Sequence, residues 1–459
     1  MGGKGIILIV LGFSIIFLVI GQNFGSLSGR AVDNETKYYV QTTAYNIAVA
    51  GANMAANEIF MDKFWDEGYS NLSFSGGIIN VYVSNTTSGS TGKVKICHIP
   101  PGETEGHTIE IASTAVPAHL AHGDYLGECG GGGYISQIAK IISEGTFNGV
   151  TKTVVVELRP SNFAKFGNFY SSISAYPATG DTFNGPFHVN ARLTTYGTPV
   201  FWGKVTSKNG LTKLGSPRDP KFYGGYEDGI DIPLEFDTAG LRSNADVVFK
   251  DTTGNGYKID VRLYFNSNGT ITHSKSINSG SWSTPKTENI SSFAPDGIIY
   301  VEKGNIYTKG TVNGSLTIVA TKLGKIGCGN VYFEDNIIYK DNPVTIPSSD
   351  DMLGIVAEEN IRIKDNADTR GKNIYTQASM FAQNGNIGPE DGLVTQNFLG
   401  NWNILGGLIA KTTRVTATYS GSTPVKGLRF VHTYDERFLL KVPPAFPHTK
   451  NFEVVSWYE

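Results

Sequence analysis

The sequence predicts a mainly β protein that begins with one long α-helix. Only 17% of its 459 residues are charged, whereas 55 are glycine, 25 are phenylalanine and 22 are tyrosine. This balance is typical of short strands joined by many turns. An apolar run near the N-terminus continues into a segment with helical periodicity, and short β-like segments follow one another through the second half of the chain. Such a length exceeds what one hydrophobic core usually organises, so two or three structural units are expected.

Charge and cysteine content exclude some classes of protein. A net charge of −3 predicts neither a nucleic-acid partner nor a strongly basic membrane surface. Three cysteines are too few for a disulfide scaffold, and their odd number leaves at least one unpaired.

The N-terminus carries one positive charge within Met1 to Gly5 and then the apolar run Ile6 to Ile20, IILIVLGFSIIFLVI. This run is shorter than the roughly 18 to 20 apolar residues of a confident membrane span. A cleaved secretory signal is one interpretation, although the following GQNFGSLSGRA offers a poor cleavage site. A plain membrane anchor is another, because the neutral residues after Ile20 extend the span. The third interpretation is a helix that continues into the folded protein.

The pattern beyond the run favours this third interpretation. The segment Ala31 to Phe64 contains no proline, and alternating spacings of three and four place one apolar stripe on a helix. A helix from Ile6 to about Phe64 would be on the order of 90 Å long. The stripe consists of Tyr45, Ala48, Ala52, Ala55 and Ile59.

This N-terminus resembles those of type IV pilins and pseudopilins. The resemblance rests on the short leader that ends Lys4-Gly5, on the hydrophobic residue that follows, and on AYNIAVAGANMA (44–55), similar to a stretch common in minor pilins. It implies cleavage between Gly5 and Ile6 by a prepilin peptidase, a helix over 6–67 with 6–25 in the inner membrane, and other pilin subunits as partners. Major pilins carry Glu at the fifth position after cleavage, where this chain has Val10. The departure points to a minor subunit.

A small β unit is expected over 68–158. Leu72 to Ser84 predicts a hairpin, and Tyr134 to Leu158 predicts two or three strands with turns at Glu144-Gly145 and Asn148-Gly149. The middle of the stretch between these segments, 93–129, is best interpreted as a separate inserted module, because its flanks, SNTTSGSTG and GGGG, are flexible-linker compositions.

The inserted module holds two of the three cysteines and four of the eight histidines. A module this small rarely folds without a metal or a disulfide. A short helix over 115–122 would bring two histidines onto one face, and cysteines on both sides would complete a structural zinc site. A Cys97–Cys129 disulfide is the alternative. The module resembles a short Cys-His motif recurrent in secreted bacterial proteins, which carries no established function. The candidate zinc ligands are Cys97, His98, His119, His122 and Cys129.

The remaining residues, 159–459, predict short strands at near-regular spacing. Gly-Asn and Asn-Gly turns separate them, which favours a right-handed β-helix or solenoid over the alternative, a β-sandwich. Within this region Cys328 is expected to be a buried core residue and His188 a hydrogen-bonded structural residue. The pair Asp350-Asp351 is expected to lie in a solvated turn.

Several phrases in this region resemble an uncharacterised domain attached to minor-pilin helices in bacterial envelope proteins. They include TGDTFNGPFHVN, GTPVFWGKV and the ending YDERFLL…PPAFP…SWYE. That resemblance implies no known activity.

These observations predict a structural subunit of a type IV pilus or a type II secretion-like system. It would be a single-pass membrane protein with its bulk extracytoplasmic. No enzyme is expected, because the chain lacks G-x-S-x-G, P-loop and H-E-x-x-H motifs; a polysaccharide-degrading β-helix would need a repeated carboxylate or basic cluster. A surface adhesin is the other alternative, with glycans bound by the aromatic residues Tyr223, Tyr226, Trp282 and Trp402.

Overall fold

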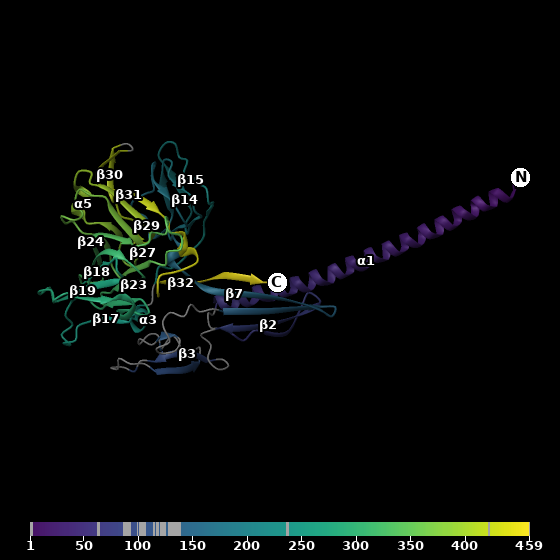
Figure 1. Cartoon of the computed structure of the whole chain (residues 1–459), viewed down its shortest axis with the longest axis horizontal. Coiled ribbons are helices and arrows are strands. Elements are labelled where there is room, and N and C mark those ends of the chain that lie inside the picture. Colours follow the sequence, from purple (N-terminus) through teal and green to yellow (C-terminus); the bar gives the residue numbers. More distant parts are fainter. Residues whose placement is uncertain are drawn as a thin grey trace. The chain divides into compact units, whose positions relative to one another are not determined.

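The computed structural model describes residues 3–61, 65–85, 93–98, 100, 107–112, 115, 119, 125–126, 139–235, 238–420 and 423–458. The chain is mainly β with one long N-terminal helix, as predicted (Figure 1). It divides into two compact units. Unit 1 comprises Met1–Val94, Gln137–Arg159 and Glu453–Glu459, and unit 2 comprises Lys95–Ser136 and Pro160–Phe452.

Unit 1 combines the helix with one five-stranded sheet of order β1-β2-β6-β7-β32. The first four strands pair antiparallel, with Ile79 opposite Gly145 and Ile141 opposite Val156. The elements are α1 (Gly3–Met61), β1 (Tyr69–Phe74), β2 (Gly77–Asn85), β6 (Ala139–Phe147), β7 (Val150–Asn162) and β32 (His448–Tyr458).

The two predicted turns of this sheet have different outcomes. The turn at Asn148-Gly149 is confirmed, and both residues have the positive φ that a tight hairpin requires. The predicted turn at Glu144-Gly145 is wrong, because both residues lie inside β6.

The C-terminal strand β32 joins the same sheet beside β7. Ser456 Oγ of this strand donates a hydrogen bond to Glu157 of β7 at 3.1 Å. From its sequence the whole C-terminus is expected to belong with residues 159–459, and its return to unit 1 depends on pairing between strands far apart in the chain.

Unit 2 contains the remaining strands and several short helices. Most of its strands belong to one continuous hydrogen-bonded network, and β3, β4 and β5 form a separate small sheet of order β4-β3-β5. The strands before residue 230 are β3 (Lys93–His98), β4 (His107–Ala112), β5 (Tyr125–Leu126), β8 (Asn168–Ser172), β9 (Thr182–Phe183), β10 (Phe187–Val189), β11 (Leu193–Tyr196), β12 (Val200–Phe201), β13 (Val205–Ser207), β14 (Leu211–Leu214), β15 (Lys221–Phe222) and β16 (Tyr226–Glu227).

The later strands and the short helices complete the unit. The strands are β17 (Val247–Phe249), β18 (Ile259–Asn266), β19 (Thr270–Ile277), β20 (Lys286–Asn289), β21 (Ile298–Val301), β22 (Ile306–Val312), β23 (Ser315–Ala320), β24 (Val331–Tyr339), β25 (Met352–Ala357), β26 (Ile361–Ile363), β27 (Ile374–Ala382), β28 (Ile387–Pro389), β29 (Gly400–Thr412), β30 (Ala417–Ser420) and β31 (Thr423–Thr433). The helices are η2 (Phe163–Lys165), α3 (Thr238–Ser243), α4 (Ile290–Phe293), α5 (Asp391–Thr395) and η3 (Glu436–Leu439).

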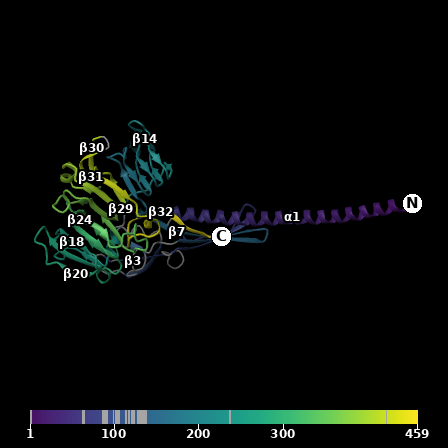
Figure 2. The same cartoon turned by 45° about the horizontal axis from the view of Figure 1, so that its top comes forward.

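Parallel pairing dominates the larger sheets of unit 2, whose strands Figure 2 shows from a second side. One sheet runs in the spatial order β17-β21-β23-β25-β27-β29-β8-β10-β13-β16, with every neighbouring pair parallel. A second parallel sheet runs β18-β22-β24-β26-β28. The chain therefore alternates between the two sheets as it advances from one strand layer to the next.

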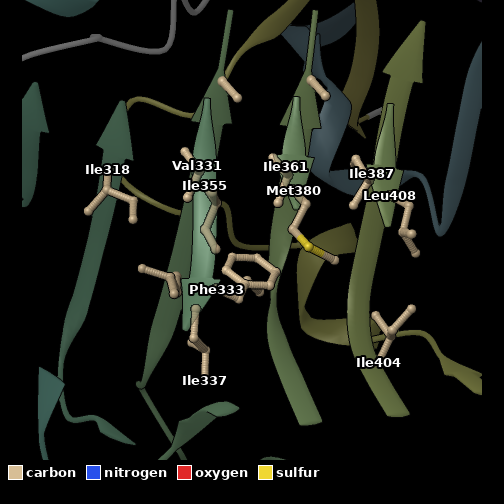
Figure 3. Packing of buried hydrophobic residues seen from close by; sticks show 14 of the residues in the cluster. Ile318, Val331, Phe333, Ile337, Ile355, Ile361, Met380, Ile387, Ile404 and Leu408 are labelled. Atoms are coloured by element: carbon tan, nitrogen blue, oxygen red, sulfur yellow. The ribbon is translucent and has the colours of Figure 1, made fainter. Parts of the chain in front are cut away.

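The main core lies between these sheets (Figure 3). Because parallel strands in register place equivalent residues above one another, the apolar side chains form columns. Ile318, Ile355, Met380 and Leu408 are register partners in one sheet. The facing column consists of Val331, Ile361 and Ile387.

The outer face of the first sheet is buried as well. A second apolar cluster contains its outward-facing column Val319, Val356, Phe381 and Ile409. Aromatic side chains from η2, from η3 and from the segment after η3 pack on this column, which explains strands such as β25 in which every residue is buried. These covering residues are Phe163, Phe438 and Phe446.

An asparagine ladder lines one turn of the stacked layers. The backbone N–H of Asn330 donates to the side-chain oxygen of Asn305 at 2.9 Å, and Asn360 and Asn386 each repeat this contact to the asparagine of the preceding layer, at 3.2 and 3.1 Å. Each amide thereby satisfies a backbone donor that a turn would otherwise leave unpaired. This ladder is the structural reason for the Asn-rich turns of the sequence.

The strand layers meet at β8 and β29, which are far apart in sequence. Leu408 pairs with Asn168 although the chain reaches these strands at opposite ends of unit 2. The layers on the two sides of this junction differ in the number of residues per layer. Val189 pairs with Ser207 on one side, whereas on the other side Ile361 pairs with Ile387, which lies farther along the chain from its partner. Layers of short and long repeat thus adjoin at β8–β29.

Candidate functional site

The N-terminal part of α1 is an uncovered apolar surface. Its large side chains from Ile6 to Ile20 are all exposed within the chain, and no charged residue occurs between Gly5 and Gly29. Its mean hydropathy reaches 2.6, and the helix is long and apolar enough to cross a membrane by length and composition. Figure 1 shows this part of α1 extending beyond the strands of its own unit.

The C-terminal part of α1 packs on the sheet of unit 1. Four of the five residues of the predicted stripe, Ala48, Ala52, Ala55 and Ile59, are completely buried, which confirms the stripe. Tyr45 is half-buried. Two further residues that the stripe did not include, Ala44 and Ile47, are also buried.

Glycines allow the helix to approach the sheet closely. A Cβ on Gly145 of β6 would overlap the carbonyl oxygen of Ala44 and the backbone nitrogen of Ala48. On the helix side, a Cβ on Gly51 would lie 2.5 Å from Ser143 Oγ and 2.7 Å from Ile79. The sequence identified Gly51 only as a weak helix former. Its packing role depends on strand residues distant in sequence.

The predicted processing residues lie in the first turns of α1. The helix begins at Gly3, so Gly5 and Ile6 are both helical, and both are exposed. The first two residues of the predicted leader lie outside the described residues.

The predicted zinc ligands are described only in part. The rings of His98 and His119 lie 5.4 Å apart, and His98 has the same centroid distance to His107, a residue that the sequence analysis did not select. The backbone of Cys97 lies in β3, opposite Tyr125 of β5. His122, Cys129, the Cys97 side chain and most of the expected helix over 115–122 lie outside the described residues. No group of metal-binding geometry occurs among the side chains that are described.

His188 is a buried structural residue, as predicted. Its Nδ1 lies 2.7 Å from Thr206 Oγ1 and its Nε2 lies 2.8 Å from Asn190 Oδ1, and burial lowers its pKa. Asn190 in turn accepts a hydrogen bond from the backbone N–H of Ile232 at 2.9 Å. The histidine therefore fixes a segment outside the sheet and is not available to a substrate.

His432 is a second buried histidine, which the sequence analysis did not single out. Its Nε2 lies 3.0 Å from the carbonyl oxygen of Gly406, and its ring stacks on Phe430. Burial lowers its pKa to about 4. The imidazole is therefore neutral in the fold at neutral pH.

The predictions for Cys328 and for the pair Asp350-Asp351 have different outcomes. Cys328 is a free, buried thiol, as expected, and burial raises its pKa. Asp351 is not part of a solvated turn, because it is 1% exposed and accepts hydrogen bonds from the backbone N–H groups of Gly314 at 2.7 Å and Asp341 at 2.8 Å. Only Asp350 of the predicted pair is exposed.

The four aromatic residues proposed for glycan binding do not form one surface. Trp402 is 0% exposed, so its assignment as an exposed platform is wrong; its indole N–H donates to Thr376 at 3.0 Å. Tyr226 is half-buried. Trp282 is also half-buried and lies under the guanidinium of Arg262. Tyr223 is exposed.

Comparison with known proteins gives little similarity in sequence. No protein-family model matches the chain, and no curated protein matches it. Among solved structures, the chain is similar to the competence-associated pilin ComZ from Thermus thermophilus, with a TM-score of 0.35 and 12% identity over 91% of this chain and 97% of that chain. At this level the similarity does not assign a function.

Proposed function

We propose that this chain is a minor pilin or pseudopilin-like subunit of a type IV pilus or a type II secretion-like system. The single observation that carries the proposal is the division of α1 into an uncovered apolar part and a packed part. In this function the first part inserts into the inner membrane before assembly and contacts other pilin helices afterwards. The second part joins it to the extracytoplasmic bulk.

The dimensions of α1 support this role. Residues 5–29 carry no charge and extend about 37 Å as a helix, which exceeds the roughly 30 Å hydrocarbon thickness of a bilayer. Large apolar side chains that the chain itself does not cover need lipid or another protein as their surroundings. A cleaved signal would not require continuation of the same helix into a packed stripe.

We infer that unit 2 is a right-handed β-solenoid displayed by this helix. The parallel pairing of successive layers and the asparagine ladder support a solenoid over a β-sandwich, whose sheets are antiparallel. The right hand follows from the general preference of parallel crossover connections. We propose no enzymatic activity for it.

We also propose that the inserted module holds a structural zinc ion. The two cysteines and four histidines of the module support this idea, because thiolate and imidazole are preferred zinc ligands. Elemental analysis of the purified full chain should find zinc, and Cys97→Ser should remove it. A Cys97–Cys129 disulfide would lower the intact mass by two hydrogens. A metal-free chain with this lower mass would contradict the zinc proposal.

The mature N-terminus tests the proposed function. Co-expression with a prepilin peptidase should give a chain that starts at Ile6 by intact-mass spectrometry. Gly5→Leu should block this cleavage, because a bulky side chain then precedes the cleaved bond, whereas the matched leader variant Gly2→Leu should still be processed. An intact Met1 in the native chain would leave only an anchor, and a start near Ala31 would mean that the apolar run is discarded.

A further inference from the structure

Unit 2 contains an open cavity of about 410 Å³ at the junction of β8 and β29. Its walls come from these two strands, from the loops that follow them, and from the hairpin β30–β31. The volume falls at the small end of the range typical of ligand pockets, about 300 to 1,000 Å³.

The change of layer size explains why a cavity forms here. The second sheet ends at β28, whereas the first sheet continues from β29 through β8 into the layers of short repeat. Among the described strands, β28 pairs with β26 and no further strand of the second sheet follows it. Three residues of the main core line the cavity, Trp402 and Leu408 from β29 and Phe187 from β10.

Aromatic side chains at the cavity leave part of their surface exposed. Tyr176 from the loop after β8 is 49% exposed, and Tyr419 from β30 is 41% exposed. Aromatic rings offer a large apolar face together with a polar edge, and Tyr loses little conformational freedom on binding. The cavity thus presents flat apolar faces beside its buried floor.

The charged residues that line the cavity are Asp181, Arg414 and Arg429, and they carry both signs. Arg414 is occupied, because it donates to Asp391 at 2.5 Å and to the carbonyl oxygen of Pro389 at 2.8 Å. One carboxylate oxygen of Asp181 accepts from the N–H of Ala178 at 2.7 Å, and the other has no hydrogen-bond partner among the described residues. Arg429 also lines the cavity.

We propose that this cavity binds a neutral saccharide. The aromatic faces suit the C–H surface of a sugar ring, the free carboxylate oxygen of Asp181 suits a hydroxyl donor, and Arg429 suits a hydroxyl acceptor. Because Asp181 and Arg429 have opposite charges, the site favours neither an anion nor a cation. Burial raises the pKa of Asp181, as expected for a carboxylate that has lost water on one side.

The test uses the full chain in a zwitterionic detergent, which avoids sugar headgroups. Saturation-transfer NMR is recorded with methyl glycosides of glucose, galactose, mannose and N-acetylglucosamine, with blocked disaccharides of these sugars, and with hexanoate as an apolar anion. At least one sugar should receive saturation. Asp181→Asn keeps the contact to Ala178 and should raise Kd roughly tenfold or more, because a hydrogen bond to a charged acceptor is lost.

A matched control separates the cavity from other aromatic surfaces. Tyr419→Ala should weaken sugar binding, whereas Tyr223→Ala, which removes an exposed ring of unit 2 that does not line the cavity, should leave Kd unchanged. The proposal is overturned if no sugar of the panel binds, if hexanoate alone binds, or if Tyr223→Ala and Tyr419→Ala have equal effects. None of these outcomes depends on processing at Ile6.

Discussion

The N-terminal part of α1 and the sheet of unit 2 contain similar apolar runs with opposite surroundings. The large apolar side chains from Ile6 to Ile20 are all exposed, whereas in β25 (Met352–Ala357) every residue is buried. The sheet is covered by the main core on one face and by the outer aromatic cluster on the other. The difference teaches that a run of apolar residues specifies burial but not the partner. For α1 that partner must come from outside the chain.

The largest expected effect comes from truncating matched aromatic residues in the two regions. Phe381→Ala removes a ring that lies 5.2 Å from Phe163, and it should lower the free energy of unfolding of unit 2 by about 3 to 5 kcal/mol. Phe17→Ala, in the exposed part of α1, should leave that stability unchanged. Hydrogen exchange of the β27 amides at increasing denaturant concentration measures the free energy of unfolding of unit 2 in both variants. Equal losses of stability in Phe381→Ala and Phe17→Ala would contradict the contrast between the two regions.

A charge in the exposed part of α1 should have the next largest effect. Phe17→Lys should disfavour insertion by about 2.5 to 3.5 kcal/mol, because a lysine then lies near the bilayer centre. Val32→Lys is the control, since Val32 is also exposed but follows the charged residue Arg30. Flotation of each variant with lipid vesicles measures the bound fraction. The account fails if Phe17→Lys and Val32→Lys bind equally well.

Acid should distinguish the two units. His432 has a pKa of about 4 in the fold and about 6.5 when unfolded, so the unfolded chain binds the extra proton between these values. The stability of unit 2 should therefore fall as the pH drops from about 6.5 to 4, by up to about 3 kcal/mol, and His188 adds to this loss.

Unit 1 serves as the internal control for this pH effect because its sequence contains no histidine. Hydrogen exchange of β6 and β25 peptides, recorded across the same pH range and corrected for intrinsic rates, compares the units directly. Selective loss of protection in β25 is expected. Greater loss of protection in β6 than in β25 would contradict the prediction.

The smallest effect concerns two glycines of the same helix. Alanine favours a helix over glycine by about 1 kcal/mol, so Gly21→Ala, where a Cβ meets nothing, should be neutral or slightly stabilising. Gly51→Ala should instead destabilise unit 1 by about 1 to 2 kcal/mol, because its Cβ contacts Ser143 and Ile79. Circular dichroism during denaturation measures the difference. A stabilising Gly51→Ala would show that α1 and the sheet are not closely packed.

Local periodicity predicted α1 well because a helical stripe is a property of nearby residues. The buried alanines at 48, 52 and 55 follow directly from their spacing. The β content and the structural role of His188 also followed from composition and immediate neighbours. Such features need no knowledge of the rest of the fold.

Contacts between distant segments explain what the sequence did not predict. Asp351 is buried because its partner Gly314 lies on a neighbouring layer, and Trp402 is buried because its strand joins the core. The cavity combines residues near 180 with residues near 415. Gly145 resembles a turn residue, but its position in β6 reflects the approach of α1. No local pattern records these pairings.

The most direct test of the central claim is the depth of α1 in a bilayer. Phe17→Trp and Tyr38→Trp variants of the full chain are reconstituted in vesicles that contain brominated lipids, and the fluorescence of the unsubstituted chain is subtracted. The account predicts strong quenching at position 17 and weak quenching at position 38. Equal quenching at both positions would contradict insertion of the uncovered part of α1.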